Sequence, residues 1–181
     1  SGAWLVGISS LFTPYSAEAL AAAAAIKARH PGGTIVMGGH HPTAMPEHVL
    51  ASPFVDYVLR GEGEASLPLL AAALRDRRPL ADIPGIAFRR EDGRLHVNPP
   101  ATASADRLPL PALDRIDRRR YRRHGRGSAV VVASRGCPLR CSYCSVAAAG
   151  WLPYRRRPLE RVLAEIEAAV LGRGVGFIDF E

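Results

Sequence analysis

The chain has 181 residues, of which 48% are hydrophobic, and a formal net charge of +7. This hydrophobic content can bury a core, so it excludes a wholly disordered chain, and the length predicts one large domain or a domain with part of a second. Between residues 115 and 126, seven arginines against one acid supply +6 of the surplus, so the charge is confined to one stretch. No run of about 18 apolar residues is present, which excludes a transmembrane helix within this chain.

Residues 1–80 alternate short apolar runs with helical patterns, which is typical of a parallel sheet flanked by helices. We expect strands at residues 4–11, 34–37 and 55–59, and helices at residues 16–28 and 64–78. Right-handed crossovers then predict a Rossmann-like (flavodoxin-like) α/β fold. Because the chain opens almost at once on a strand, we expect it to begin inside a longer protein.

The pattern changes after residue 80. Two short strands between Ile83 and Val97 flank Asp92-Gly93, a hairpin signal, and prolines and arginines follow, so residues 81–127 are expected to be a hairpin and linker. A second α/β unit is expected at residues 128–181, with strands at 129–132 and 175–180. Between them lies a helix whose apolar residues share one face: Leu159, Val162, Leu163, Ile166, Ala169 and Val170. Two such strands start a βα barrel but cannot close it.

The three cysteines of the chain lie within eight residues, at Cys137, Cys141 and Cys144. This odd, tight C-x3-C-x2-C group is no disulfide framework, so a reducing, cytoplasmic location is expected. Three thiolate ligands leave one iron of a cubane cluster open for a substrate. A zinc site would need a fourth ligand that is absent at knuckle spacing, and a metal-free structural role suits this turn-rich, polar loop poorly; both alternatives stay open.

This spacing, with Tyr143 directly before the last cysteine, resembles the radical S-adenosylmethionine (SAM) superfamily. The resemblance implies a 4Fe-4S cluster on the three cysteines, whose open iron is chelated by the amino and carboxylate groups of SAM. One electron from the cluster would then cleave SAM to a 5′-deoxyadenosyl radical. The resemblance also puts Tyr143 near the adenine, and Asp179 or Glu181 near the methionyl ammonium, although the glycine pair often found there is missing.

The first two predicted strands are followed by Ser9-Ser10-Leu11 and by Gly38-Gly39, and this pair resembles the S-x-L and G-G motifs of cobalamin-binding domains. Small residues at the carboxyl ends of adjacent strands let the nucleotide tail of the corrinoid enter the sheet crevice. The resemblance implies that cobalamin also contacts residues near Thr13, His40, Gly61 and Glu62. The family's cobalt-ligating histidine motif would precede Ser9, so the lower ligand of the cobalt stays undecided.

Two alternatives remain for Gly61-x-Gly63-x-x-Ser66. The run resembles a dinucleotide fingerprint, but Glu62 and Glu64 would repel a pyrophosphate. The glycines could also simply make tight turns.

Together the motifs resemble the family of cobalamin-binding-domain radical SAM enzymes, of which this chain would be a part. That family implies methyl transfer to an unactivated carbon, or a radical cyclisation or rearrangement, on a small-molecule substrate with an external one-electron donor of the flavodoxin or ferredoxin type. No catalytic residue is assigned. An RNA-modifying methylthiotransferase fits less well because residues 1–136 contain no cysteine, and a nucleic-acid-binding module fits less well because residues 118–123 contain only one aromatic residue.

Overall fold

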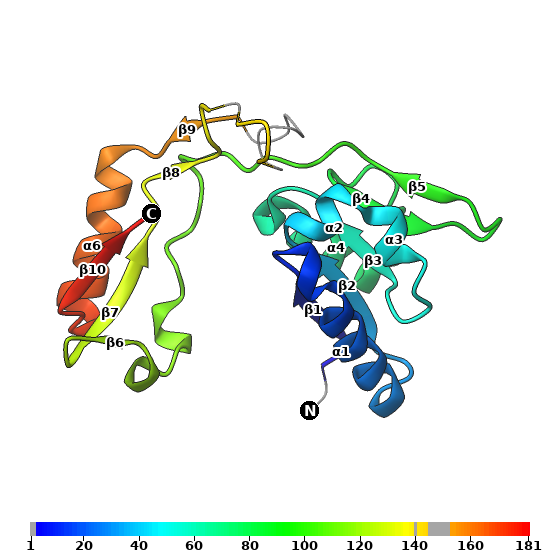
Figure 1. The fold of residues 1–181 in the computed structure, drawn as a ribbon, viewed down its shortest axis with the longest axis horizontal. Coiled ribbons are helices and arrows are strands. Elements are labelled where there is room, and N and C mark those ends of the chain that lie inside the picture. The colour runs from blue at the N-terminus through cyan, green and yellow to red at the C-terminus, as the bar shows by residue number, and fades with distance from the viewer. Residues whose placement is uncertain (1–2, 140, 145–152) are drawn as a thin grey trace. The chain divides into compact units, whose positions relative to one another are not determined.

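A computed structural model describes residues 3–139, 141–144 and 153–181. Contacts divide the chain into two compact units (Figure 1). The first contains residues 3–103 and 142–144, and the second contains the described parts of 104–141 and 152–181. Within the described part of the chain, no helix is both long and apolar enough to span a bilayer.

The first unit is built on one five-stranded sheet with the order β1-β2-β3-β4-β5. Its strands are β1 (Leu5–Ser9), β2 (Thr34–Gly38), β3 (Tyr57–Leu59), β4 (Ile86–Arg89) and β5 (Leu95–Val97). The first three pair in parallel, and the last two add antiparallel strands at one edge. The register places Ser9 beside Gly38, so the ends of β1 and β2 meet.

Helices cover both faces of this sheet. They are the 3-10 turn η1 (Thr13–Tyr15), α1 (Ser16–Arg29), α2 (His40–Ala44), α3 (Pro46–Leu50) and α4 (Gly63–Asp76). On β2, Ile35 and Met37 pack in one buried cluster with residues of α1 and α3, whereas Val36 packs in another with residues of α4. Successive strand residues point to opposite faces, so an unbroken apolar run is what a strand buried on both faces requires.

The hairpin of β4 and β5 belongs to this sheet, because β4 pairs with β3 and continues it. Its turn contains Gly93 with a φ of +80°, the left-handed conformation that glycine adopts without strain. From the sequence alone this hairpin was expected in the linker at residues 81–127, whereas the structure places its strands in the first unit.

The second unit contains a β-α-β arrangement. Its main elements are β7 (Arg126–Val131), α6 (Leu159–Arg173) and β10 (Phe177–Phe180), and the two strands pair in parallel. Smaller elements are η2 (Leu113–Arg115), η3 (Arg118–Arg120), β6 (Arg122–Arg123), β8 (Ser134–Arg135) and β9 (Arg155–Arg156). The predicted α/β class, with a parallel sheet followed by a first βα unit, is confirmed.

The buried face of α6 differs from the predicted one. Val162 and Ala169 are buried as expected, but Glu165 is buried between them, while Leu159 and Leu163 are exposed. Among the described elements, α6 packs against residues of β7, β10 and η2, and the stripe that it buries is narrower than its apolar pattern predicts.

Candidate functional site

A pocket of about 240 Å³ opens at the carboxyl ends of β1, β2 and β3 in the first unit. Five of the ten residues that line it are glycines: Gly7, Gly38, Gly39, Gly61 and Gly63. The others are Ile8, Ser9, Val36, Leu59 and Leu67. Ligands of open parallel sheets bind at this edge, where successive loops diverge. The structure therefore brings together four of the residues predicted to contact cobalamin, namely Ser9, Gly38, Gly39 and Gly61.

Backbone contacts hold the ends of β1 and β2 together at the pocket. The Ser10 N–H donates to the Gly38 carbonyl at 2.9 Å, and the His41 N–H donates to the Ser10 carbonyl at 3.2 Å. Gly39 has a φ of +104°, and a Cβ at this position would lie 2.5 Å from the Ser10 carbonyl oxygen. Only glycine fits such a close crossing, so the fold itself requires the second glycine of the G-G motif.

Thr43 joins the loops that follow β2 and β3. Its buried hydroxyl donates to the Gly39 carbonyl at 2.7 Å and accepts from the Gly61 N–H at 2.9 Å. The Thr43 carbonyl in turn accepts from Arg60 Nε at 3.1 Å, and burial lowers the pKa of that guanidinium. One side chain thus fixes the two glycine loops relative to each other. The sequence analysis missed Thr43 because nothing local marks a threonine on a short helix.

Gly7 and Gly63 leave open space where a side chain would lie. A Cβ built on either glycine has no heavy atom within 4 Å, although both residues line the pocket. Glycine inside a strand weakens it and often marks a close approach by a ligand. Gly7 was also missed, and the available signal was a glycine two residues before Ser9, on the same face of β1.

Glu62 is turned toward the chain rather than the pocket. Its buried carboxylate accepts from the Ala103 N–H at 2.6 Å, and its own N–H donates to the Ala101 carbonyl at 2.9 Å. Ser66 is also occupied, because its hydroxyl donates to the Pro84 carbonyl at 2.6 Å. The side chains of Glu62 and Ser66 therefore hydrogen-bond within the fold and do not line the pocket.

Leu11, Thr13 and His40 do not line the pocket. The Thr13 hydroxyl lies 3.1 Å from Nδ1 of the buried His41, and His41 Nε2 lies 3.3 Å from His48 Nδ1. Burial, and next the neighbouring His48, lower the pKa of His41. The Thr13, His41 and His48 side chains thus form a polar chain that connects η1 to α3.

The three cysteines lie on the segment that follows β8. All three are free thiols, with Cys137 exposed and the other two partly exposed, and Tyr143 is 90% exposed. Among the described residues, the structure gathers no group of three or more His, Cys, Asp or Glu side chains that could hold a metal ion. The predicted ligands are thus accessible, but the structure does not bring them together.

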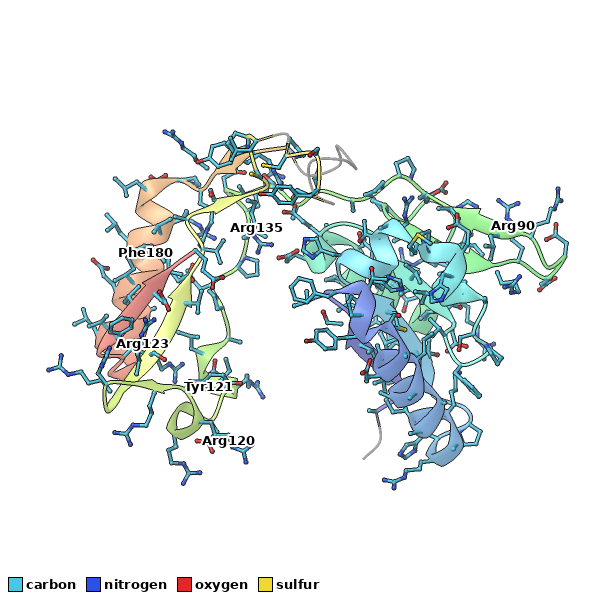
Figure 2. All side chains as sticks on the ribbon, viewed as in Figure 1. Arg90, Arg120, Tyr121, Arg123, Arg135 and Phe180 are labelled. Carbon is cyan, nitrogen blue, oxygen red and sulfur yellow. The ribbon has the colours of Figure 1, made fainter. Side chains whose placement is uncertain are left out.

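On β10, Asp179 accepts from Arg123 Nη1 at 2.6 Å, and the Arg123 guanidinium lies 4.8 Å from the Phe177 ring centre (Figure 2). Asp179 also lines a cavity of about 330 Å³ with Val130 and other residues of the second unit. The Glu181 N–H donates to the Val131 carbonyl at 3.1 Å, so the end of β10 stays beside β7.

Residues 1–71 match the family model described as the B12 binding domain. An uncharacterized methyltransferase, PH0819, from Pyrococcus horikoshii is 34% identical over 149 residues, which cover 81% of this chain and 32% of the relative. The anaerobic magnesium-protoporphyrin IX monomethyl ester cyclase of Synechocystis is 34% identical over 143 residues, with 78% of this chain and 28% of the relative covered.

Among solved structures, the radical SAM methyltransferase TsrM from Kitasatospora setae superposes with a TM-score of 0.76 at 25% identity, covering 98% of this chain and 36% of TsrM. The chain belongs to the B12-binding-domain radical SAM family. It spans about a third of the length of the curated relatives it matches.

The residues of this family member suit the cofactors that the family implies. Cobalamin suits the pocket of the first unit, because Gly7 and Gly63 leave space there and the walls are apolar with one hydroxyl residue, Ser9. An iron–sulfur cluster suits the cysteine segment, because such a cluster is held by cysteine thiolates and the three thiols here are free and accessible. The donor chemistry fits, although the thiols are not gathered.

Proposed function

We propose that this chain is part of a cobalamin-dependent radical SAM enzyme that reductively cleaves SAM at a 4Fe-4S cluster. The observation that carries the proposal is the glycine-lined pocket of the B12-binding part, on the same chain as the C-x3-C-x2-C loop. Neither feature alone would separate this enzyme from other corrinoid or iron–sulfur proteins.

In the first unit, Ser9, Gly38, Gly39 and Gly61 would surround the nucleotide tail of cobalamin. The apolar walls supplied by Val36, Leu59 and Leu67 favour a flat aromatic group, and the Ser9 hydroxyl can hydrogen-bond a polar atom of the tail. When bound, cobalamin supplies a transferable methyl group or a one-electron centre. Backbone hydrogen bonds at the strand ends fix the loops that frame this pocket.

In the cysteine loop, Cys137, Cys141 and Cys144 would hold the cluster through their thiolates. Metal binding commonly supplies the free energy that gathers its ligands, so the loop need not hold the thiols at bonding distance beforehand. When bound, the cluster supplies the electron for SAM cleavage. Tyr143 is exposed enough to stack on an adenine, and Asp179 could meet an ammonium group once its ion pair with Arg123 opens.

For the reaction itself we propose methyl transfer to an unactivated carbon, with radical cyclisation or rearrangement as the alternative. The named relatives include two methyltransferases and one cyclase, and the methyltransferases support the first choice. The substrate would be a small molecule, and the electron would come from a flavodoxin-type or ferredoxin-type donor in the cytoplasm.

The proposal is tested by Cys141→Ala in the full-length protein after anaerobic reconstitution with iron and sulfide. We expect the wild type to hold about four irons per chain and to cleave SAM, and the variant to lose both properties. Ser142→Ala is the matched control, because it alters the same turn without removing a thiol. Full iron content and normal SAM cleavage in Cys141→Ala would refute the assignment.

A further inference from the structure

A buried ion pair lies in the second unit. Arg157 Nη2 and Glu165 Oε2 are 2.6 Å apart, and their side chains are only 6% and 4% exposed. Other ion pairs of this unit lie at the surface, such as Arg119 with Asp117, whose side chains are 89% and 41% exposed. Removing two charges from water costs several kcal/mol per ion, so a buried pair calls for an explanation.

Arg157 contacts the base of the cysteine loop, by which we mean residues 132–135 and 155–157, on either side of the segment that carries the cysteines. Its Nη1 donates to the Val132 carbonyl at 2.7 Å, directly after β7, and its backbone N–H donates to the Ala133 carbonyl at 3.0 Å. Next to these contacts, β8 and β9 pair as an antiparallel ladder, in which Ser134 faces Arg156 and Arg135 faces Arg155. The two ends of the segment that carries all three cysteines are therefore held side by side.

The Glu165 side of the pair belongs to α6, the long helix of the unit. It lies on the buried stripe of α6, between Val162 and Ala169, and α6 packs against β7. A carboxylate at this position gains nothing from apolar burial. Buried ion pairs can often be replaced by apolar side chains of similar volume without loss of stability, so stability alone explains this pair poorly.

We propose that Arg157 and Glu165 are positioning residues that keep the two ends of the cysteine segment paired for cluster binding, an inference that rests on the proposed function. The Arg157 guanidinium forms an ion pair with Glu165 through Nη2 and donates to the Val132 carbonyl through Nη1, and its fixed planar fork lets one side chain tie α6 to the end of β7. A lysine keeps the charge but cannot make both contacts with that geometry. Glutamine at position 165 keeps the shape but removes the charge.

The first test measures the loop without any metal. In the apo, full-length protein, Arg157→Lys and Glu165→Gln should raise amide hydrogen exchange by about tenfold or more at residues 132–135 and 155–157, while exchange in the centre of β7 stays near wild type. Arg161→Lys is the matched control, because Arg161, like Glu165, is on α6 and its guanidinium, like that of Arg157, donates to a backbone carbonyl, but to that of Leu108 at 2.5 Å. A uniform rise across the whole second unit, or no rise at all, would overturn the positioning role.

The second test measures cluster retention. After reconstitution, both variants should lose iron to an external chelator about tenfold faster than wild type, because a loop whose two ends are less firmly held releases its metal more readily. Arg161→Lys should match the wild type. Iron release unchanged in Arg157→Lys and Glu165→Gln would overturn this inference and leave the proposed function standing, whereas a wild type that binds no cluster would mean that the proposed function itself has failed.

Discussion

The two regions proposed to bind cofactors are built in different ways. The pocket of the first unit is formed by backbone at the ends of three strands, where Gly39, Thr43 and Gly61 are fixed by hydrogen bonds of 2.7–2.9 Å or by a close crossing. The cysteine loop has no such lattice among its described residues, and its three thiols are free and ungathered. A site made of main chain can exist before its ligand arrives, whereas a site made of exposed side chains needs the ligand to assemble it.

The largest effect is expected for Gly39→Ala, which tests whether the pocket of the first unit depends on its backbone. Alanine at a φ of +104°, with its Cβ 2.5 Å from the Ser10 carbonyl oxygen, must either strain the backbone or separate the ends of β1 and β2. We expect the free energy of unfolding to fall by about 2 kcal/mol or more and cobalamin binding to be lost. Urea unfolding followed by circular dichroism, together with a cobalamin titration, measures both effects.

Gly32→Ala is the control for this change, because Gly32 has no positive φ and a Cβ there meets nothing within 4 Å. It should alter stability by no more than about 0.5 kcal/mol. If Gly39→Ala were as mild as Gly32→Ala, the strand ends would not be the rigid frame described here.

Local sequence patterns predicted the elements that carry strong periodicity or burial. The run Ile35-Val36-Met37 marks a strand buried on both faces, and α4 and α6 were expected within a few residues of where they lie. The helices α2 and α3 were missed because five residues are too few to show a helical period. The pairing of β4 with β3 was missed because it joins residues far apart in the sequence.

The candidate site was predicted where chemistry depends on residue type and missed where it depends on tertiary contact. Ser9, Gly38 and Gly61 could be read from motifs, and the structure places all three around one pocket. The roles of Thr43 and Glu165 arise from partners 18 and 8 residues away, Gly61 and Arg157. Neither a buried threonine nor a buried glutamate is distinguishable in sequence from the same residue on the surface.

The second prediction tests the space inside the pocket without disturbing the strand ends that surround it. Gly7→Val adds a branched side chain that suits a strand and whose Cβ has no heavy atom within 4 Å, but the side chain occupies the pocket that Gly7 lines. We expect the unfolding free energy to stay the same or rise, and cobalamin affinity to fall by about tenfold or more, because overpacking typically costs 1–3 kcal/mol. Equilibrium titration with hydroxocobalamin measures the affinity. Gly7→Ala should give a smaller loss, and equal affinity in all three proteins would place the ligand elsewhere.

A smaller effect is expected in the pH dependence of the free energy of unfolding, through His41 of the first unit. Because burial and His48 lower the pKa of His41 in the fold, the unfolded chain binds the proton more tightly. Stability is therefore complete above the ordinary histidine pKa of about 6.5 and falls as the pH drops below it. Unfolding free energies measured between about pH 8 and 5 should show this loss. His48→Gln removes the repulsive partner and should reduce this loss only in part, because burial is the larger cause of the lowered pKa of His41. His41→Gln should remove it, and an unchanged pH dependence in His41→Gln would contradict the prediction.

The smallest expected effect is the one that most directly tests how the cysteine loop differs from the pocket. Cys137 is exposed and free, so Cys137→Ser removes no packing, and in the metal-free protein it should change the unfolding free energy by no more than about 0.5 kcal/mol. In the reconstituted wild type, bound metal adds stability that the variant cannot gain, because a ligand that binds only the folded state shifts unfolding in proportion to its binding free energy. The difference between wild type and Cys137→Ser should thus appear only after iron and sulfide are added. If the variant were already destabilised without metal, the thiols would be part of a preformed structure, and the contrast between the two regions would fail.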